Sequence, residues 1–138
     1  MRILVFILSA FYLIAGCDST DQPLHNIEGV YKGTYSITHN VGTDSIKKMQ
    51  GAVTFEFTKT TYHYYGEEYL LPPAGAGKYT YTNSYISLVD TALHSDEFDP
   101  SLILHGNFAY YYNQKVLKLT QSDLLHRRFH ELNLTKQN

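Results

Sequence analysis

Histidine side chains are the first candidates for chemistry in this 138-residue chain, which contains seven of them. On a helix, the four-residue spacing of His126 and His130 would bring both imidazoles to one metal ion. The residues around them alternate between apolar and polar types as in a strand, where positions four apart are separated by roughly 13 Å. We therefore expect strand or surface histidines here, no metal site and no cofactor.

Carboxylates are the second candidates, because one predicted loop contains Asp90, Asp96, Glu97 and Asp99. Calcium prefers several such oxygens, but the spacing is not that of an EF-hand and no turn glycine lies among them. A solvated acidic loop is the expected outcome. The chain also lacks a G-x-S-x-G motif, a P-loop and a dinucleotide fingerprint. We expect a protein that is not an enzyme.

Tyrosine is heavily used, with 13 residues, and tryptophan is absent. Aromatic rings can stack on sugars or hold an apolar ligand, and tyrosine hydroxyls can orient it. The candidate ligand-facing side chains are Tyr62, Tyr64, Tyr79, Tyr81, Tyr110 and Tyr112. The same rings could instead fill the core of a small barrel through cross-strand pairs. So many large side chains favour the filled interior.

A period of two residues dominates the chain and predicts the elements that must position these side chains. Strands are expected over residues 30–37, 52–58, 61–65, 78–81, 85–89, 108–112, 115–120 and 128–134, with a short apolar run at 102–104. Eight or nine strands at this spacing predict an all-β fold, as a single antiparallel up-and-down barrel of about eight strands or a sandwich. A long connection, residues 90–101, has room for a helical turn. Residues 67–77 form a second predicted loop.

The first seventeen residues predict the localisation of the protein. Arg2 precedes an apolar run that is short for a membrane-spanning helix, and the run ends in Leu13-Ile14-Ala15-Gly16-Cys17. This ending resembles a bacterial lipobox, which implies a lipoprotein signal peptide over residues 1–16 and lipid, including an acyl chain such as palmitate, on Cys17. An ordinary signal peptide and an uncleaved signal anchor are the alternatives. Residues 17–26 are then a tether and residues 27–138 the barrel domain.

Composition narrows the possible partners. The net charge is −2 and the basic residues are scattered, which gives no electrostatic footprint for nucleic acid. Cys17 is the only cysteine, so no disulfide within the chain is possible. We expect a monomer that reaches the membrane through its lipid alone, in the cell envelope and at the outer membrane more than the inner one.

Several segments resemble small lipocalin-like lipoproteins of Bacteroidota. The likeness lies in the opening Glu28-Gly29-Val30-Tyr31, in the Gly-rich turn before Tyr79, and in the stretch from Asp96 to Tyr110 with its Leu102-Ile103-Leu104-His105-Gly106 core. It implies a lipocalin-like barrel in the cell envelope, from a family largely without assigned activity. The leading hypothesis is a non-catalytic protein that binds a small apolar or glycan-like ligand or a partner protein.

A second, local resemblance gives an alternative function. Ala74-Gly75-Ala76-Gly77-Lys78-Tyr79 is similar to the S-G-x-x-A-K-Y loop of membrane-bound lysozyme inhibitors. It implies a periplasmic inhibitor of a glycosidase such as lysozyme, acting through the loop from Pro72 to Lys78. A purely structural envelope component is the third hypothesis.

Three short motifs resemble the signal for O-glycosylation of exported Bacteroidota proteins, an Asp followed by Ser or Thr and an apolar residue or Thr. They are Asp18-Ser19-Thr20, Asp44-Ser45-Ile46 and Asp90-Thr91-Ala92. The resemblance implies glycans on Ser19, Ser45 and Thr91, the last two in predicted loops. Ordinary turn chemistry is the alternative, because Asp and Ser favour loops.

Overall fold

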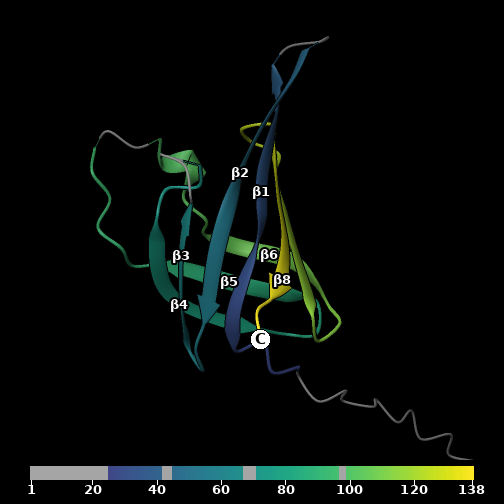
Figure 1. The fold of residues 1–138 in the computed structure, drawn as a ribbon. Helices are drawn as coiled ribbons and strands as arrows, with labels where there is room; N and C mark the ends of the chain where they lie inside the picture. Colours follow the sequence, from purple (N-terminus) through teal and green to yellow (C-terminus); the bar gives the residue numbers. More distant parts are fainter. Residues whose placement is uncertain (1–24, 42–44, 67–70, 97–98) are drawn as a thin grey trace, which may run out of the picture.

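The computed structural model describes residues 25–41, 45–66, 71–96 and 99–138, which form a closed antiparallel β-barrel. Its strands are β1 (Gly29–Val41), β2 (Ser45–Phe57), β3 (Thr61–Gly66), β4 (Gly75–Tyr81), β5 (Tyr85–Asp90), β6 (Gly106–Tyr112), β7 (Val116–Asp123) and β8 (Arg128–Lys136). Each strand pairs with the next in the chain, and β8 closes onto β1 (Figure 1). The prediction of an all-β fold with one antiparallel barrel of about eight strands is confirmed.

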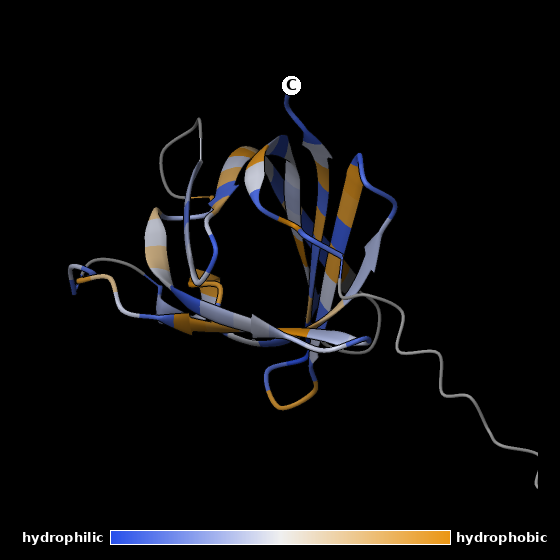
Figure 2. Ribbon diagram, turned by 90° about the horizontal axis from the view of Figure 1, so that it is seen from below, coloured by the Kyte–Doolittle hydropathy of each residue, from blue (hydrophilic) through white to orange (hydrophobic). Residues whose placement is uncertain are grey.

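The alternation read from the sequence places apolar side chains inside the barrel. Seen end-on, the strands form a ring in which hydrophobic and hydrophilic residues alternate along individual strands (Figure 2). Because successive side chains of a strand point to opposite faces, every strand sends its apolar set into one core. The buried core comprises Ile27, Tyr31, Tyr35, Ile37, Val53, Phe55, Phe57, Tyr62, Tyr64, Tyr79, Ile86, Leu88, Leu104, Phe108, Leu117, Leu119, Leu132 and Leu134.

Strands β1 and β2 are longer than the sequence predicted, at 13 residues each. Their register runs from the pair Gly29–Phe57 to the pair Val41–Ser45, well beyond the apolar alternation. The backbone ladder carries this extension, while exposed polar side chains such as Lys48 and Gln50 give no period-two pattern of burial. Ser45 therefore lies on β2 as its first residue, and its prediction as a loop residue was wrong.

The short apolar run at residues 102–104 does not form the ninth strand that the sequence allowed. The 3-10 turn η1 (Pro100–Leu102) occupies this part of the connection, so the expected helical turn is present at its far end. Leu104 then enters the core, where its N–H donates to the Tyr64 hydroxyl at 2.9 Å. The Leu104 N–H thus bonds to a side chain and not to a neighbouring strand. The run therefore packs against the barrel without becoming a strand of its sheet.

The predicted loop from Pro72 to Lys78 is the second correction. Gly75 begins β4 and pairs with Tyr64 of β3, so residues 75–78 belong to the barrel wall. A Cβ atom on Gly77 would lie 1.9 Å from the Val89 carbonyl oxygen, which shows how closely the neighbouring strand approaches. Small residues here permit strand packing and do not loosen a loop. Pro72 and Pro73 are also buried.

The barrel has two different ends. At one end the chain enters and leaves: Ile27 is buried in the core, and the Gln137 N–H donates to the Val30 carbonyl at 2.8 Å. The other end, here called the loop end, has the β1–β2, β3–β4, β5–β6 and β7–β8 connections. All eight strands and the whole core lie within residues 27–136, so the chain from Asp18 onward contains a complete folding unit. Within the described ranges, no helix is long and apolar enough to cross a membrane.

Candidate functional site

The inner faces of β1 and β8 change from apolar to polar toward the loop end. Successive cross-strand pairs are Gly33–Leu134, Tyr35–Leu132, Ile37–His130 and His39–Arg128. On the other side of β1, His39 pairs with Lys47 of β2. Because the side chains of one row share a face, this end of the barrel carries a cluster of ionisable groups. We call it the polar mouth, made of Tyr35, His39, Lys47, Asp99, Arg128 and His130.

A buried hydrogen bond forms the floor of the polar mouth. Tyr35 Oη lies 2.9 Å from His130 Nδ1, and both side chains are almost fully buried. Burial, and then the nearby Arg128 charge, lower the pKa of His130 to about 4, while burial raises the pKa of Tyr35 above its ordinary value. Both groups are therefore neutral near pH 7 and are joined by an ordinary hydrogen bond.

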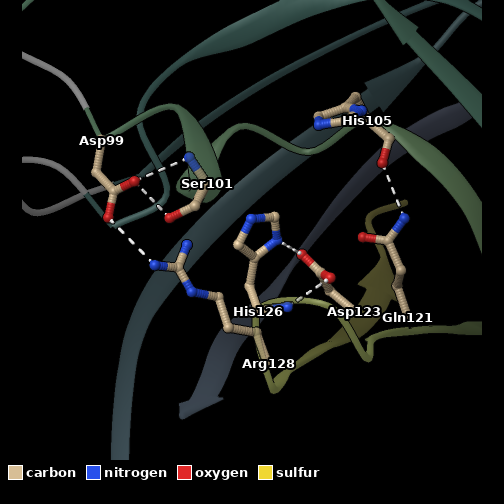
Figure 3. A network of polar contacts seen from close by, with 7 residues as sticks. All are labelled: Asp99, Ser101, His105, Gln121, Asp123, His126 and Arg128. Atoms are coloured by element: carbon tan, nitrogen blue, oxygen red, sulfur yellow. Dashed lines mark hydrogen bonds and ion pairs between the residues drawn. The ribbon is translucent and has the colours of Figure 1, made fainter.

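Arg128 presents unpartnered donors above this floor. Its Nε and Nη1 atoms are buried and have no hydrogen-bond partner among the described residues. Its Nη2 atom lies 3.9 Å from an Asp99 carboxylate oxygen, too far for a hydrogen bond (Figure 3). Leaving a buried donor unpaired costs roughly 1–3 kcal/mol, and more when the group is charged. Within the described residues, Arg128 is thus a cation with one long ion pair to Asp99 and two buried nitrogens that lack a hydrogen-bond partner.

His39 extends this donor surface toward β2. Its Nε2 atom is also buried without a partner in the described part of the chain. Burial and the Arg128 charge lower the pKa of His39, with Lys47 acting in the same direction and Asp99 in the opposite one. Because His39 is neutral near pH 7, the positive charge of the row comes from its two ends, Lys47 and Arg128. The neutral imidazole can still donate a hydrogen bond from Nε2.

Asp99 is the acidic member of the polar mouth, and the β5–β6 connection positions it. It accepts from the Ser101 N–H at 2.9 Å and from the Ser101 hydroxyl, and these bonds lower the pKa of its carboxyl group. Below it, Gln121 Nε2 donates to the His105 carbonyl at 2.9 Å (Figure 3). These contacts attach the connection to β7, at the end of the barrel where Arg128 lies.

Two surface grooves adjoin the polar mouth. One of about 430 Å³ lies between the β1–β2 hairpin and the β7–β8 turn, with Ile46 and Arg128 in its lining. Another of about 480 Å³ lies beside η1 and is lined by Pro100 and Ile103 among others. Pro100 directly follows Asp99 in the chain, so each groove begins next to a charged residue of the polar mouth. The first groove lies mainly on the outer face of the barrel, because Thr38, Asn40 and Ile46 alternate with the inward row, and Arg128 is the member of the polar mouth that lines it.

The two histidines considered first are not brought together. His126 lies in the turn after β7, not on a strand as predicted, because it pairs with Asp123, whose Oδ2 lies 2.6 Å from its Nδ1. His130 points into the core. The described residues contain no group of three or more His, Cys, Asp or Glu side chains that could hold a metal ion. In the acidic stretch Asp90 bonds to His94, whereas Asp99 caps η1.

The candidate ligand-facing tyrosines lie on the inner face, and their hydroxyls are used locally. Tyr62, Tyr64 and Tyr79 are buried, while Tyr81, Tyr110 and Tyr112 are partly buried. The Tyr79 hydroxyl donates to the Thr58 carbonyl at 2.7 Å, and that of Tyr110 to the Thr82 carbonyl at 2.8 Å. Rings of Phe55 and Tyr64 stack with centroids 5.0 Å apart. This arrangement fits the filled interior that the composition favoured.

The remaining sequence candidates have different positions. Thr91 is exposed after β5, where its N–H donates to the Ala76 carbonyl at 2.8 Å, so its prediction as a loop residue is confirmed. Cys17 and Ser19 lie outside the described residues. His25 and Asn26, at the end of the predicted tether, contact Tyr112: its hydroxyl donates to the Asn26 carbonyl at 3.2 Å.

The polar mouth itself was not predicted from the sequence. His39 and Lys47 continue the inward rows of β1 and β2 at steps of two residues, and this continuation was the available signal. Arg128 joins them only through the β1–β8 closure, which pairs residues 89 positions apart in the chain. No family model, curated protein or solved structure matches this chain.

Proposed function

We propose that this chain is a lipid-anchored, non-catalytic binding protein of the cell envelope that holds a small ligand at the polar mouth. The observation that carries the proposal is the set of buried, unpartnered donors on Arg128 and His39, facing the loop end of a barrel whose interior is packed. A ligand at this end has hydrogen-bonding partners and two apolar grooves nearby. Because the core is filled by side chains, a ligand bound across the mouth is favoured over one enclosed inside the barrel.

The lipobox-like ending at Cys17 supports the membrane anchor, and the closed barrel fits the lipocalin-like lipoproteins of Bacteroidota that the sequence resembles. The chain enters the barrel at the end opposite the polar mouth, so an anchor on Cys17 leaves the ligand site facing away from its membrane attachment. Cys17→Ser should release the protein from the membrane fraction of a lipoprotein-processing host. Retention in that fraction would contradict lipid attachment through this thiol.

Non-catalytic binding is proposed because the polar mouth offers donors and a single carboxylate. Acid–base chemistry needs a proton carrier whose pKa lies near the working pH, and burial moves the pKa of His130 down to about 4. Inhibition of a glycosidase through the segment from Pro72 to Lys78 is not proposed further, since half of this segment is barrel wall and its prolines are buried.

Native mass spectrometry of the chain from Asp18 to Asn138, secreted by a related host, tests the binding function. A reproducible extra mass that is lost on denaturation would support a carried ligand and reveal its identity. The bare polypeptide mass, obtained also after incubation with envelope extracts, would contradict it. The matched variant Arg128→Gln should lose the extra mass, whereas Lys115→Gln, in the exposed β6–β7 turn at the opposite end of the barrel, should keep it.

A further inference from the structure

Three basic side chains form one row across three neighbouring strands at the polar mouth. His39 of β1 pairs with Lys47 of β2 on one side and with Arg128 of β8 on the other. Cross-strand partners are separated by only about 5 Å, so the row is a compact donor surface. Lys47 and Arg128 carry the charge at the two ends of the row, with His39 between them, so an anion that lies over the row is attracted by both.

The donors of this row are already desolvated. Arg128 Nε and Nη1 together carry three N–H bonds, and all of them lack partners within the described ranges, as does Nε2 of His39. Among the described residues the carboxylate that pairs with Arg128 is Asp99, whose Oδ2 lies 3.9 Å from Nη2. Asp99 is moreover occupied by Ser101, which donates through both its backbone N–H and its hydroxyl (Figure 3).

An oxyanion fits these groups better than a neutral oxygen. Hydrogen bonds from a guanidinium to carboxylate or phosphate oxygens are shorter and roughly twice as strong as those between neutral groups. A cation that is partly removed from water also gains more from a counter-charge than an exposed one does. The side chain of Arg128 is only 18% exposed, in contrast to its exposed neighbour Arg127.

We propose that the polar mouth is an oxyanion site, in which Arg128 and His39 bind the carboxylate or phosphate group of a small ligand and Lys47 adds positive charge. This inference rests on the proposed binding function and names the chemical class of its ligand. Asp99 limits the site to one anionic group, because its carboxylate lies 3.9 Å from Arg128 Nη2 and repels a second negative charge.

Arginine Nε–H signals in a two-dimensional ¹H–¹⁵N NMR spectrum test the proposal directly. The chain from Asp18 onward contains two arginines, Arg127 and Arg128, so the buried donor and its exposed neighbour report side by side. The probes are benzoate, phenyl phosphate and benzyl alcohol, which share an aromatic ring and differ in the head group, together with inorganic phosphate. Arg127→Lys and Arg128→Lys assign the two signals.

We expect benzoate or phenyl phosphate to shift the Arg128 signal until it saturates, while the Arg127 signal moves little and benzyl alcohol moves neither. Whichever of the two anions binds more tightly identifies the head group as carboxylate or phosphate. Arg128→Gln should weaken that binding about tenfold or more, as followed by backbone amide shifts at the mouth. Saturation by inorganic phosphate alone would also support an oxyanion site, with the head group supplying the affinity.

Parallel, unsaturated shifts of both arginines would overturn the inference, because they indicate non-specific ion pairing. Equal binding of benzyl alcohol and benzoate would overturn it too, yet leave the binding function intact. A neutral ligand found by native mass spectrometry would likewise overturn the oxyanion site and leave the binding function intact. These comparisons use the unaltered chain, so they hold even where Arg128→Gln does not fold.

Discussion

Acid should destabilise this barrel through His130, well before its carboxylates are protonated. The imidazole is buried against Tyr35, and burial lowers its pKa from 6.5 to about 4, with Arg128, His39 and His105 acting in the same direction and Asp123 in the opposite one. Between these two pH values the unfolded chain binds a proton that the folded chain does not. The free energy of unfolding therefore rises with pH across this window and reaches its full value above about pH 6.5.

The size of the effect follows from the two pKa values. Lowering the pH from 7.5 to 4.5 should reduce the free energy of unfolding by about 2.5 kcal/mol through His130 alone. The pKa of His39 is also lowered, so this residue adds to the loss with the same sign. The lowered pKa values of Asp99, Asp123 and Glu131 contribute stability that is lost mainly below this range, as those carboxylates take up protons.

Urea denaturation of the chain from Asp18 onward, followed by circular dichroism from pH 7.5 to 4.5, measures this dependence. His130→Gln keeps a polar group beside Tyr35 but cannot titrate. The acid-induced loss of unfolding free energy should therefore shrink by most of the expected amount of about 2.5 kcal/mol. His126→Gln, in the exposed β7–β8 turn, should retain the loss. An undiminished loss in His130→Gln would refute the reasoning.

Three further changes test the fold and the predicted modification. Gly33→Ala would place a Cβ atom 1.9 Å from the Asn133 carbonyl oxygen, so circular dichroism should show no cooperative unfolding transition. Tyr79→Phe removes the hydroxyl that donates to the Thr58 carbonyl, and thermal denaturation should show a loss of about 1 kcal/mol. Thr91→Ala should lower the intact mass by one covalent glycan when the protein is made in a glycosylating Bacteroidota host.

Each of these changes has a contrary outcome. A native-like transition in Gly33→Ala would mean that β8 can move away from β1 at little cost. Tyr85→Phe is the control for Tyr79, because Tyr85 is 54% exposed and should tolerate the loss of its hydroxyl. An intact mass equal to the lipidated polypeptide alone would contradict glycosylation of Thr91, and likewise of Ser45.

Strand positions were predictable where burial imposes a period of two residues. Tyr31, Tyr35 and Ile37 alternate with polar residues, and all three are fully buried. The outer half of the β1–β2 hairpin lacks that pattern, because backbone pairing holds it without burial on a face. The start of β4 at Gly75 also lacks that pattern, because glycines carry no side chain whose polarity could alternate. The sequence therefore predicted a loop there.

The candidate site could not be predicted from the sequence, for a different reason. Its members come from β1, β2, β8 and the β5–β6 connection, and only the closure of the ring makes them neighbours. An arginine beside an exposed turn, such as Arg128, has the same local sequence context as Arg127, although one is largely covered and the other is not. Burial of a charge depends on long-range packing, which a local pattern does not encode.

The unequal lengths of β2 and β3 have a consequence for how two copies of the protein meet. β2 pairs with β3 only from Val53 to Phe57, so among the described residues its outer half shows no strand partner on that side. Such an edge can recruit a strand from a neighbouring copy. Lys47 and Lys48 lie on this exposed stretch, and their charges oppose edge-to-edge association. Under the proposed function Lys47 serves two purposes, because its charge attracts an anion at the mouth and also repels the edge of a second copy.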